Sequence, residues 1–229
     1  MYLCPPMESV TEKKSRGDKV EAFILKLKAF TYFLFNLKDL VRVVSLRRQH
    51  EGTQLRPAEI IRIFQAIGKF RQCNLLVFGL GNDSPMWCEI NRTGRTVFLE
   101  DYKPWFDKIT TMYPEIEAYP VSYSGNITQW RELMDQPEKL ELRLPAEVPL
   151  HAWDVVLVDG PRGHQYSENI PGRMSSIYMS SQLVGKGGYV FVHDAERNVE
   201  KSYSATFLDG ADHVKKVRGR AFMLIHRFP

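Results

Sequence analysis

The feature that most constrains the fold of this chain is a repeated alternation of short apolar runs with helical stretches, which begins at residue 74. Each apolar run has the length of a strand and is followed by a glycine or a polar residue. The predicted strands span residues 74–78, 96–99, 117–121, 153–158 and 188–192, and the helices between them span residues 84–91, 103–112, 127–134 and 173–183. Unbroken apolar strands that alternate with helices indicate a parallel sheet covered on both faces. The sequence therefore predicts an α/β fold with a mostly parallel, doubly wound sheet.

The chain divides into three predicted parts. Residues 1–18 form a flexible leader, residues 19–54 form an N-terminal helical extension with an amphipathic pattern, and residues 55–229 contain the sheet. Near the C-terminus, residues 204–208 and 221–225 are predicted to add strands at one edge of the sheet.

The composition is that of an ordinary globular protein, with 229 residues of which 44% are hydrophobic and 25% are charged. The three cysteines are far apart in the sequence, so neither a disulfide framework nor a cysteine zinc site is expected. The excess positive charge lies in residues 1–72, which indicates a solvated helix face or a basic arm. No apolar stretch has the length of a bilayer crossing and no signal peptide is visible, so the chain as written is predicted to be soluble.

Two glycines and a glutamate at the ends of the first two strands indicate a nucleoside site. Gly79 and Gly81 follow the first strand and allow a close approach of the backbone to a ligand, although a G-x-G pair is a weak signal alone. Position 84 is Ser where a dinucleotide fingerprint has Gly, which disfavours a pyrophosphate ligand. Glu100 ends the second strand, where a carboxylate accepts hydrogen bonds from a ribose diol or, alternatively, caps the next helix. We therefore expect S-adenosylmethionine as the ligand, with Asp83 as a further contact.

Acidic residues end the fourth and fifth strands. Asp159 and Asp194 are expected to converge because these strands are predicted neighbours, and two converging carboxylates share a proton or hold a divalent cation. They are candidates for catalysis and for a metal site, where a bound cation would activate a substrate hydroxyl. His193 is an alternative general base. Two simpler interpretations stay open, in which Asp159 is only a turn residue and His193 a buried histidine without a chemical role.

Basic residues near the same strand ends indicate an acidic substrate. Arg162, His164 and Arg173 are the candidates for binding it, and Arg197 lies close in sequence to the fifth strand. A guanidinium group matches the geometry of a carboxylate, so a uronic acid is a suitable substrate. The alternative is that each arginine lies on the surface or forms an internal ion pair.

Several segments of this sequence resemble the plant polysaccharide-biosynthesis family that contains the glucuronoxylan 4-O-methyltransferases. The resemblance runs from about Leu55 to the C-terminus and rests on NLLVFGLGNDSPMW (74–87), GRTVFLED (94–101), WDVVLVDGP (153–161), PGRMSSIY (171–178), VFVHDAERNVE (190–200) and YSATFL (203–208). It implies a Rossmann-like methyltransferase fold, S-adenosylmethionine as the donor and a glucuronic acid residue of xylan as the acceptor. Some relatives act on arabinogalactan, and one branch affects xylan without an established activity. The resemblance also implies dependence on a divalent metal, for which Asp159 and Asp194 are the candidates.

Three features depart from the family pattern. Plant members begin with a membrane anchor that holds them in the Golgi, and none is visible here. The segment VDGPRGH (158–164) replaces a sequence close to VDAPTGY, and Asn82 stands where the family has His. The first departure concerns the compartment, which stays open between the Golgi lumen and elsewhere, and the other two concern the acceptor.

The combined prediction is an O-methyltransferase that acts on a uronic-acid-containing saccharide. One rival is a non-catalytic polysaccharide-binding or xylan-assembly factor that keeps the fold. The other is a nucleic-acid methyltransferase, which the acidic character of residues 73–229 disfavours, so no nucleic-acid partner is expected. The oligomeric state stays open.

Overall fold

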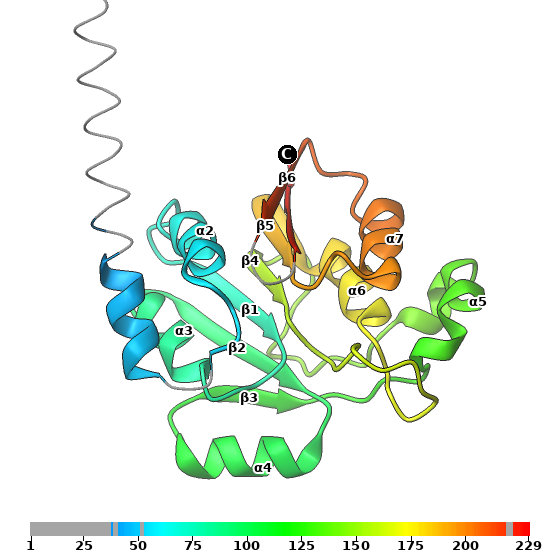
Figure 1. Ribbon diagram of the computed structural model, residues 1–229, viewed down its shortest axis with the longest axis horizontal. Coiled ribbons are helices and arrows are strands. Elements are labelled where there is room, and N and C mark those ends of the chain that lie inside the picture. Colours follow the sequence, from blue (N-terminus) through cyan, green and yellow to red (C-terminus); the bar gives the residue numbers. More distant parts are fainter. Residues whose placement is uncertain (1–37, 39–40, 51–52, 219–221) are drawn as a thin grey trace, which may run out of the picture. The chain divides into compact units, whose positions relative to one another are not determined.

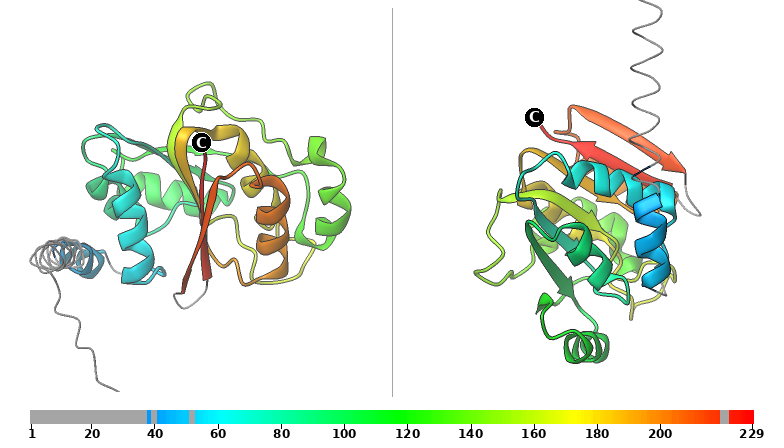
Figure 2. Two further views of the ribbon diagram at one scale, coloured as in Figure 1. Left: turned by 90° about the horizontal axis from the view of Figure 1, so that it is seen from above. Right: turned by 90° about the vertical axis from the view of Figure 1, so that its left-hand side faces the viewer.

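The structure is a computed structural model that describes residues 38, 41–50, 53–218 and 222–229. Residues 42–229 form one compact unit built around a seven-stranded sheet (Figures 1 and 2). The strands are β1 (Asn74–Phe78), β2 (Arg95–Glu100), β3 (Glu117–Pro120), β4 (Trp153–Val158), β5 (Val184–Val192), β6 (His213–Arg218) and β7 (Phe222–Arg227). Their order is β3-β2-β1-β4-β5-β7-β6, with β1 to β5 parallel and β7 antiparallel to both β5 and β6. The first five strands follow the Rossmann order, so the predicted doubly wound sheet is confirmed.

Helices cover both faces of the sheet. They are α2 (Pro57–Ile67), α3 (Ser84–Ile90), α4 (Lys103–Met112), α5 (Trp130–Met134), α6 (Met174–Leu183) and α7 (Asn198–Phe207), with short 3-10 turns η1 (Ile127–Gln129) and η2 (Pro137–Leu140). Successive residues of β1 point to opposite faces: Leu75 joins the core under α2 to α4, and Leu76 joins the core under α5 to α7 (Figure 1). Both residues are fully buried, as the unbroken apolar run of this strand predicts.

Helix α2 precedes the sheet and has strong start signals in its sequence. Pro57 occupies the first helical position, and the Glu59 side chain accepts a hydrogen bond from the Arg56 amide. Residues 41–49 are also helical, and Val43 and Leu46 pack into the same core as α2. The end of the predicted helical extension therefore packs with the sheet. The predicted leader, and most of the extension, lie outside the described residues.

Two predictions at the C-terminal end of the chain need correction. Residues 204–208 were expected to form a strand, but they belong to helix α7 and its end. The buried positions of α7 are Val199, Glu200, Tyr203 and Ser204, a helical spacing that the Tyr, Thr and Phe of the segment obscured. Strand β6 was not predicted because its sequence, HVKKVR, is polar. Strand β7 lies at residues 222–227, close to the predicted edge strand.

The predicted helix 127–134 consists of η1 followed by α5. No helix in the described part of the chain combines the length and the apolar character that a bilayer crossing needs.

Candidate functional site

A cleft of about 690 Å³ opens beyond the carboxyl ends of the strands, where β2 and β4 flank β1 on opposite sides. Its volume is in the range of small-molecule sites. All but one of the candidate residues line it: Gly79, Gly81, Asp83, Glu100, Asp159, Arg162, His164, Arg173 and Asp194. The exception is His193, which is 6% exposed and lies behind Asp159. The structure thus brings the predicted donor, acceptor and catalytic residues to one place.

Gly79 makes a close backbone approach at the floor of the cleft. Its φ of 109° lies in the region that favours glycine, and a Cβ atom built there would lie 3.1 Å from the Gly160 nitrogen. The Gly160 amide donates a hydrogen bond of 2.6 Å to the Phe78 carbonyl oxygen, so the turns after β1 and β4 touch. Ser84 takes the place of a third glycine, and its hydroxyl accepts a hydrogen bond of 2.9 Å from the Gly81 amide.

Glu100 is fixed at the end of β2 by two backbone donors. Its Oε2 accepts a hydrogen bond of 2.8 Å from the Leu80 amide, and its Oε1 accepts one of 2.9 Å from the Tyr102 amide. Burial raises the pKa of this carboxyl, and the two amides partly offset that effect. Each carboxylate oxygen retains a second lone pair, so the side chain, which lines the cleft, is able to accept further hydrogen bonds.

Asp83 lines the cleft together with Gly79, Gly81 and Glu100, and it lies near enough to Asp159 for their charges to interact. Burial, with the nearby charge of Asp159 as the second cause, raises the pKa of the Asp83 carboxyl from 3.8 to about 7. Its protonation therefore changes near neutral pH, and this was not predictable from the amino-acid pattern.

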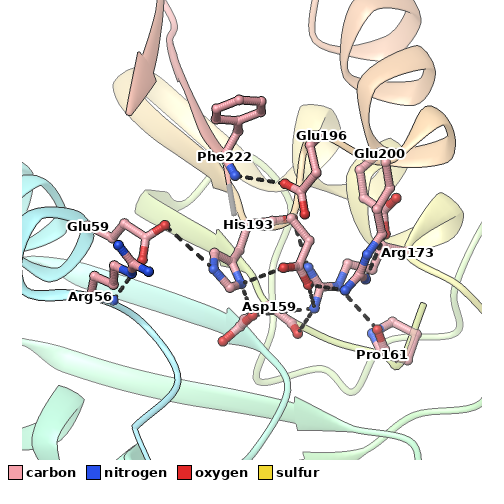
Figure 3. Close-up of polar contacts among 11 residues, drawn as sticks. Arg56, Glu59, Asp159, Pro161, Arg173, His193, Glu196, Glu200 and Phe222 are labelled. Carbon is pink, nitrogen blue, oxygen red and sulfur yellow. Dashed lines mark hydrogen bonds and ion pairs between the residues drawn. The ribbon is translucent and has the colours of Figure 1, made fainter. Parts of the chain in front are cut away.

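Asp159, His193 and Asp194 form an acidic cluster at the ends of β4 and β5, and Figure 3 shows Asp159 and His193 side by side. His193 Nδ1 lies 2.8 Å from Asp159 Oδ1. Arg173 Nη2 lies 3.4 Å from Asp159 Oδ1 and 3.1 Å from Asp194 Oδ2, and Arg197 Nη2 lies 2.8 Å from the same Asp194 oxygen. The predicted convergence of the two aspartates is therefore present, and two guanidinium groups accompany it.

The charges of this cluster stabilise one another. Burial raises the pKa of the Asp159 carboxyl, but the His193 hydrogen bond and the Arg173 charge outweigh it and hold that pKa below its ordinary value. Burial lowers the pKa of His193, but Asp159 and Asp194 outweigh it and the pKa lies above its ordinary value. Asp159 is thus ionised at neutral pH, and the imidazole faces it as a hydrogen-bond donor.

The basic candidates differ in what they contact. Arg173 is 5% exposed and donates hydrogen bonds to the carbonyl oxygens of Pro161, His193 and Asp159. Its guanidinium group is therefore already hydrogen-bonded within the protein. Arg162 and His164 are exposed at the cleft. The Arg162 guanidinium carbon lies 5.0 Å from the centre of the Tyr102 ring. Arg162 is therefore better placed than Arg173 to meet a ligand from solution.

A divalent cation does not fit the acidic cluster as its side chains stand. Asp159, His193 and Asp194 offer ligand atoms that all lie within 4.8 Å of one another. The Arg173 guanidinium, however, lies within ion-pair distance of both carboxylates and supplies the positive charge that a metal ion would bring. A metal ion there would have to displace it, so we assign no chemical step to a metal.

Three residues near the site were not anticipated from the sequence. Tyr102 and Trp105 line the cleft beside Glu100, and the Trp105 indole donates a hydrogen bond to the Leu80 carbonyl oxygen. A signal existed for Tyr102, which lies two residues after the end of β2, but Trp105 lies in the first turn of α4. Glu59 Oε1 lies 3.6 Å from His193 Nε2, and no sequence signal singled out Glu59.

Comparison with known proteins assigns the family. The model of the IRX15/IRX15L/GXM family matches residues 58–142 and 136–223. The chain belongs to the IRX15/IRX15L/GXM family. The family relatives include glucuronoxylan 4-O-methyltransferase 1 of Arabidopsis thaliana, which is 38% identical over 183 residues, covering 71% of this chain and 64% of the relative. Arabinogalactan O-methyltransferase 1 of the same plant is 36% identical over 232 residues, covering 91% of this chain and 75% of the relative.

This member of the IRX15/IRX15L/GXM family thus spans less than two thirds of the glucuronoxylan relative. Among solved structures, human methyltransferase-like protein 13 in complex with SAH aligns with a TM-score of 0.48 at 13% identity, covering 72% of this chain and 76% of that chain. At this TM-score and identity, the structural match gives no information on the fold beyond the strand order.

Proposed function

We propose that the chain transfers a methyl group from S-adenosylmethionine to a hydroxyl of a glucuronic acid residue in a polysaccharide. The observation that carries the proposal is that one cleft holds both a nucleoside-type site, made by Gly79 and Glu100, and the ionised carboxylate of Asp159. Names within the IRX15/IRX15L/GXM family, which include glucuronoxylan and arabinogalactan methyltransferases, support the reaction type and the saccharide class.

The donor would lie across the ends of β1 and β2. Glu100 would accept hydrogen bonds from the ribose hydroxyls, while the backbone of Gly79 and Gly81, which line the cleft, would lie along the chain that carries the sulfonium. Asp83 would face the positive charge of the donor, since it lines the cleft beside Gly81 and its carboxyl interacts with the charge of Asp159. Apolar walls for the nucleoside come from Val77, Trp87 and Phe98, which also line the cleft.

Methyl transfer requires the hydroxyl oxygen to be aligned with the methyl carbon more than it requires either group to be activated. The hydroxyl oxygen attacks the methyl carbon, the new C–O bond forms as the C–S bond breaks, and the hydroxyl proton passes to a base. Asp159 is the proposed base because it is ionised and 27% exposed at the cleft. His193 is less suited to this role, since it is buried behind Asp159 and its pKa is raised. Asp194 would keep Arg173 and Arg197 in place beside the reacting groups.

The acceptor would enter from the exposed side of the cleft. Arg162 and His164 lie there, and a guanidinium group pairs well with the carboxylate of a uronic acid. The exposed Tyr102 ring, on which Arg162 stacks, offers an apolar surface for a sugar ring. Arg173 would hold the turn after β4 rather than bind the acceptor, because three carbonyl oxygens accept its hydrogen bonds.

A methyl-transfer assay tests this function. The protein is incubated with methyl-labelled S-adenosylmethionine and with glucuronoxylan, arabinogalactan, small uronides or unsubstituted xylan, each with and without a chelator. We expect label on the uronic acid residues of a charged acceptor and none on unsubstituted xylan. Binding of xylan without any transfer of label would favour an assembly factor, and transfer to RNA with a steep salt dependence would favour a nucleic-acid enzyme.

A further inference from the structure

Helix α2 carries a carboxylate on a face that otherwise buries hydrocarbon. The Glu59 side chain is fully buried, as are Ile60 and Ile63 of the same helix. Its Oε2 accepts a hydrogen bond of 2.7 Å from the Arg56 amide, which closes the first turn. Its Oε1 has no hydrogen-bond partner among the described residues. Glutamate is almost never fully buried without a partner, so the cap alone does not account for this burial.

The unused Glu59 oxygen faces the histidine of the acidic cluster (Figure 3). Glu59 Oε1 lies 3.6 Å from His193 Nε2, while His193 Nδ1 lies 2.8 Å from Asp159 Oδ1. Each nitrogen of the buried ring thus faces a carboxylate oxygen. The backbone around the ring is fixed as well, because the His193 carbonyl oxygen accepts a hydrogen bond of 2.8 Å from Arg173 Nη1. The hydrogen bond made by one ring nitrogen determines whether the other nitrogen carries a proton.

The Asp159 carboxylate is held on one of its two oxygens. Within the described part of the chain, its side-chain contacts with His193 and Arg173 run through Oδ1. Oδ2 is therefore the oxygen that is left for an acceptor hydroxyl in the cleft. The orientation of this carboxylate depends on the ring that holds Oδ1, and a misplaced reacting group loses much of the rate advantage that alignment gives.

We propose that Glu59 is a positioning residue for methyl transfer, which holds the His193 ring from the side opposite Asp159 and so keeps Asp159 Oδ2 directed at the acceptor. This role rests on the proposed function and goes beyond it, because Glu59 lies on a helix before the sheet and does not line the cleft. It also accounts for a buried carboxylate whose second oxygen has no other described hydrogen-bond partner.

The test is the variant Glu59→Gln in the full chain. Glutamine fills a similar volume and still accepts the Arg56 hydrogen bond, since a capping box takes Glu or Gln. It removes the negative charge that faces His193. We expect kcat to fall about tenfold, because a misplaced Asp159 carboxylate loses part of the rate advantage that alignment gives. The KM for the acceptor and the Kd for the donor should stay within about twofold, because Glu59 touches neither.

The matched control is Ile63→Val, which loosens the same buried face of α2 without altering a polar group. It should lower the melting temperature and leave kcat unchanged once the folded fraction is taken into account. An unchanged kcat in Glu59→Gln overturns the proposal, and so does a loss of kcat that Ile63→Val reproduces at an equal melting temperature.

A readout that needs no turnover separates this proposal from the proposed function. If the wild-type chain transfers no methyl group, the proposed function fails, and with it the role in catalysis. The contact is then examined through the 15N shift of His193 Nε2, assigned by its loss in His193→Asn. Glu59→Gln should move this shift and Ile63→Val should not. An unmoved shift in Glu59→Gln overturns the claim that Glu59 holds the ring.

Discussion

At the scale of single residues, two carboxyl groups of the cleft differ in protonation because of their neighbours. Asp159 is kept ionised, since the His193 hydrogen bond and the Arg173 charge outweigh its burial and lower its pKa. At Asp83, burial together with the Asp159 charge outweighs the hydrogen bonds to the carboxyl and the charge of His193, and raises its pKa to about 7. One site thus holds a carboxylate suited to accept a hydrogen bond from a hydroxyl and a second carboxyl whose charge depends on its ligand.

The raised pKa of Asp83 predicts a pH-dependent affinity for the donor. Free Asp83 is largely protonated below pH 7, and a cationic donor favours the ionised carboxylate, so affinity should increase as the pH rises from 6 to 8. For one coupled proton the increase is about tenfold. Calorimetric titration of wild-type and Asp83→Asn protein measures it, and the variant should lack this component. An identical pH dependence in both proteins would contradict the assignment.

The exposed guanidinium of Arg162 predicts a selective effect on the acceptor. Arg162→Ala should raise the KM for glucuronoxylan by about tenfold or more, which corresponds to the loss of one charged hydrogen bond. The Kd for the donor should not change. The control is Arg143→Ala, an exposed arginine that does not line the cleft. Equal KM values for the two variants would show that Arg162 does not bind the acceptor.

At the scale of elements, the alternation of apolar runs and helices was enough to predict the central strands. Strands β1 and β4 begin and end where the sequence indicated, because an apolar run that is buried on both faces leaves no ambiguity about its length. The C-terminal segments were harder to predict. Residues 204–208 combine β-prone residues with helical burial, and β6 is a polar edge strand whose pairing with β7 comes from the fold rather than from its own pattern.

The location of the candidate site was predictable from the sequence, as were the central strands. In a parallel sheet, the residues that follow the strands collect at one edge, which places Gly79, Glu100, Asp159 and Asp194 together. An internal ion pair was one alternative for Arg173, but its partners Asp159 and Asp194 were not predictable, because they depend on how the loop after β4 folds back. Glu59 was not predicted, because its approach to His193 depends on how α2 packs against the sheet.

A single buried side chain joins three elements on one side of the sheet. Asn91, at the end of α3, is 2% exposed, and its Nδ2 donates to Cys73 O at 2.9 Å, Arg95 O at 3.0 Å and Thr96 Oγ1 at 3.0 Å. Asn91→Asp replaces this donor with an acceptor and should lower the free energy of unfolding by about 2 kcal/mol or more. Urea denaturation measures it.

The control for this prediction is Asn169→Asp in an exposed loop, which should change the unfolding free energy by less than about 0.5 kcal/mol. A value for Asn91→Asp that matches the control would mean that the three contacts do not join α3, β1 and β2.

At the scale of the whole molecule, buried acids make stability depend on pH. Glu200 of α7 is fully buried, neither carboxylate oxygen has a hydrogen-bond partner among the described residues, and burial raises its pKa. Arg197 Nη1, 3.6 Å from Glu200 Oε1, and the charge of Arg173 offset this only in part. The protonated Glu200 carboxyl contributes favourably to the free energy of unfolding, and this contribution is complete below its ordinary pKa of 4.5. It is lost as the pH rises through the pKa of the folded state.

Glu200→Gln should therefore be more stable than the wild type at pH 7.5, with a smaller or reversed difference at pH 4.5. Urea denaturation across this range measures the two free energies of unfolding. The control is Glu168→Gln in an exposed loop, which should change the free energy of unfolding at pH 7.5 by less than about 0.5 kcal/mol. A Glu200→Gln protein that loses stability at pH 7.5 would show that the buried carboxylate is a net stabilising partner of the arginines.

The proposed function depends on the donor and the acceptor meeting in one cleft, between the end of β2 and the ends of β4 and β5. A crystal structure with S-adenosylhomocysteine and an acidic xylo-oligosaccharide measures this arrangement directly. We predict the ribose hydroxyls on the Glu100 carboxylate, the sulfur on the side of Asp159, and a uronic acid hydroxyl within hydrogen-bond distance of Asp159 Oδ2. A nucleoside bound elsewhere, or a saccharide bound away from Asp159, would contradict the account.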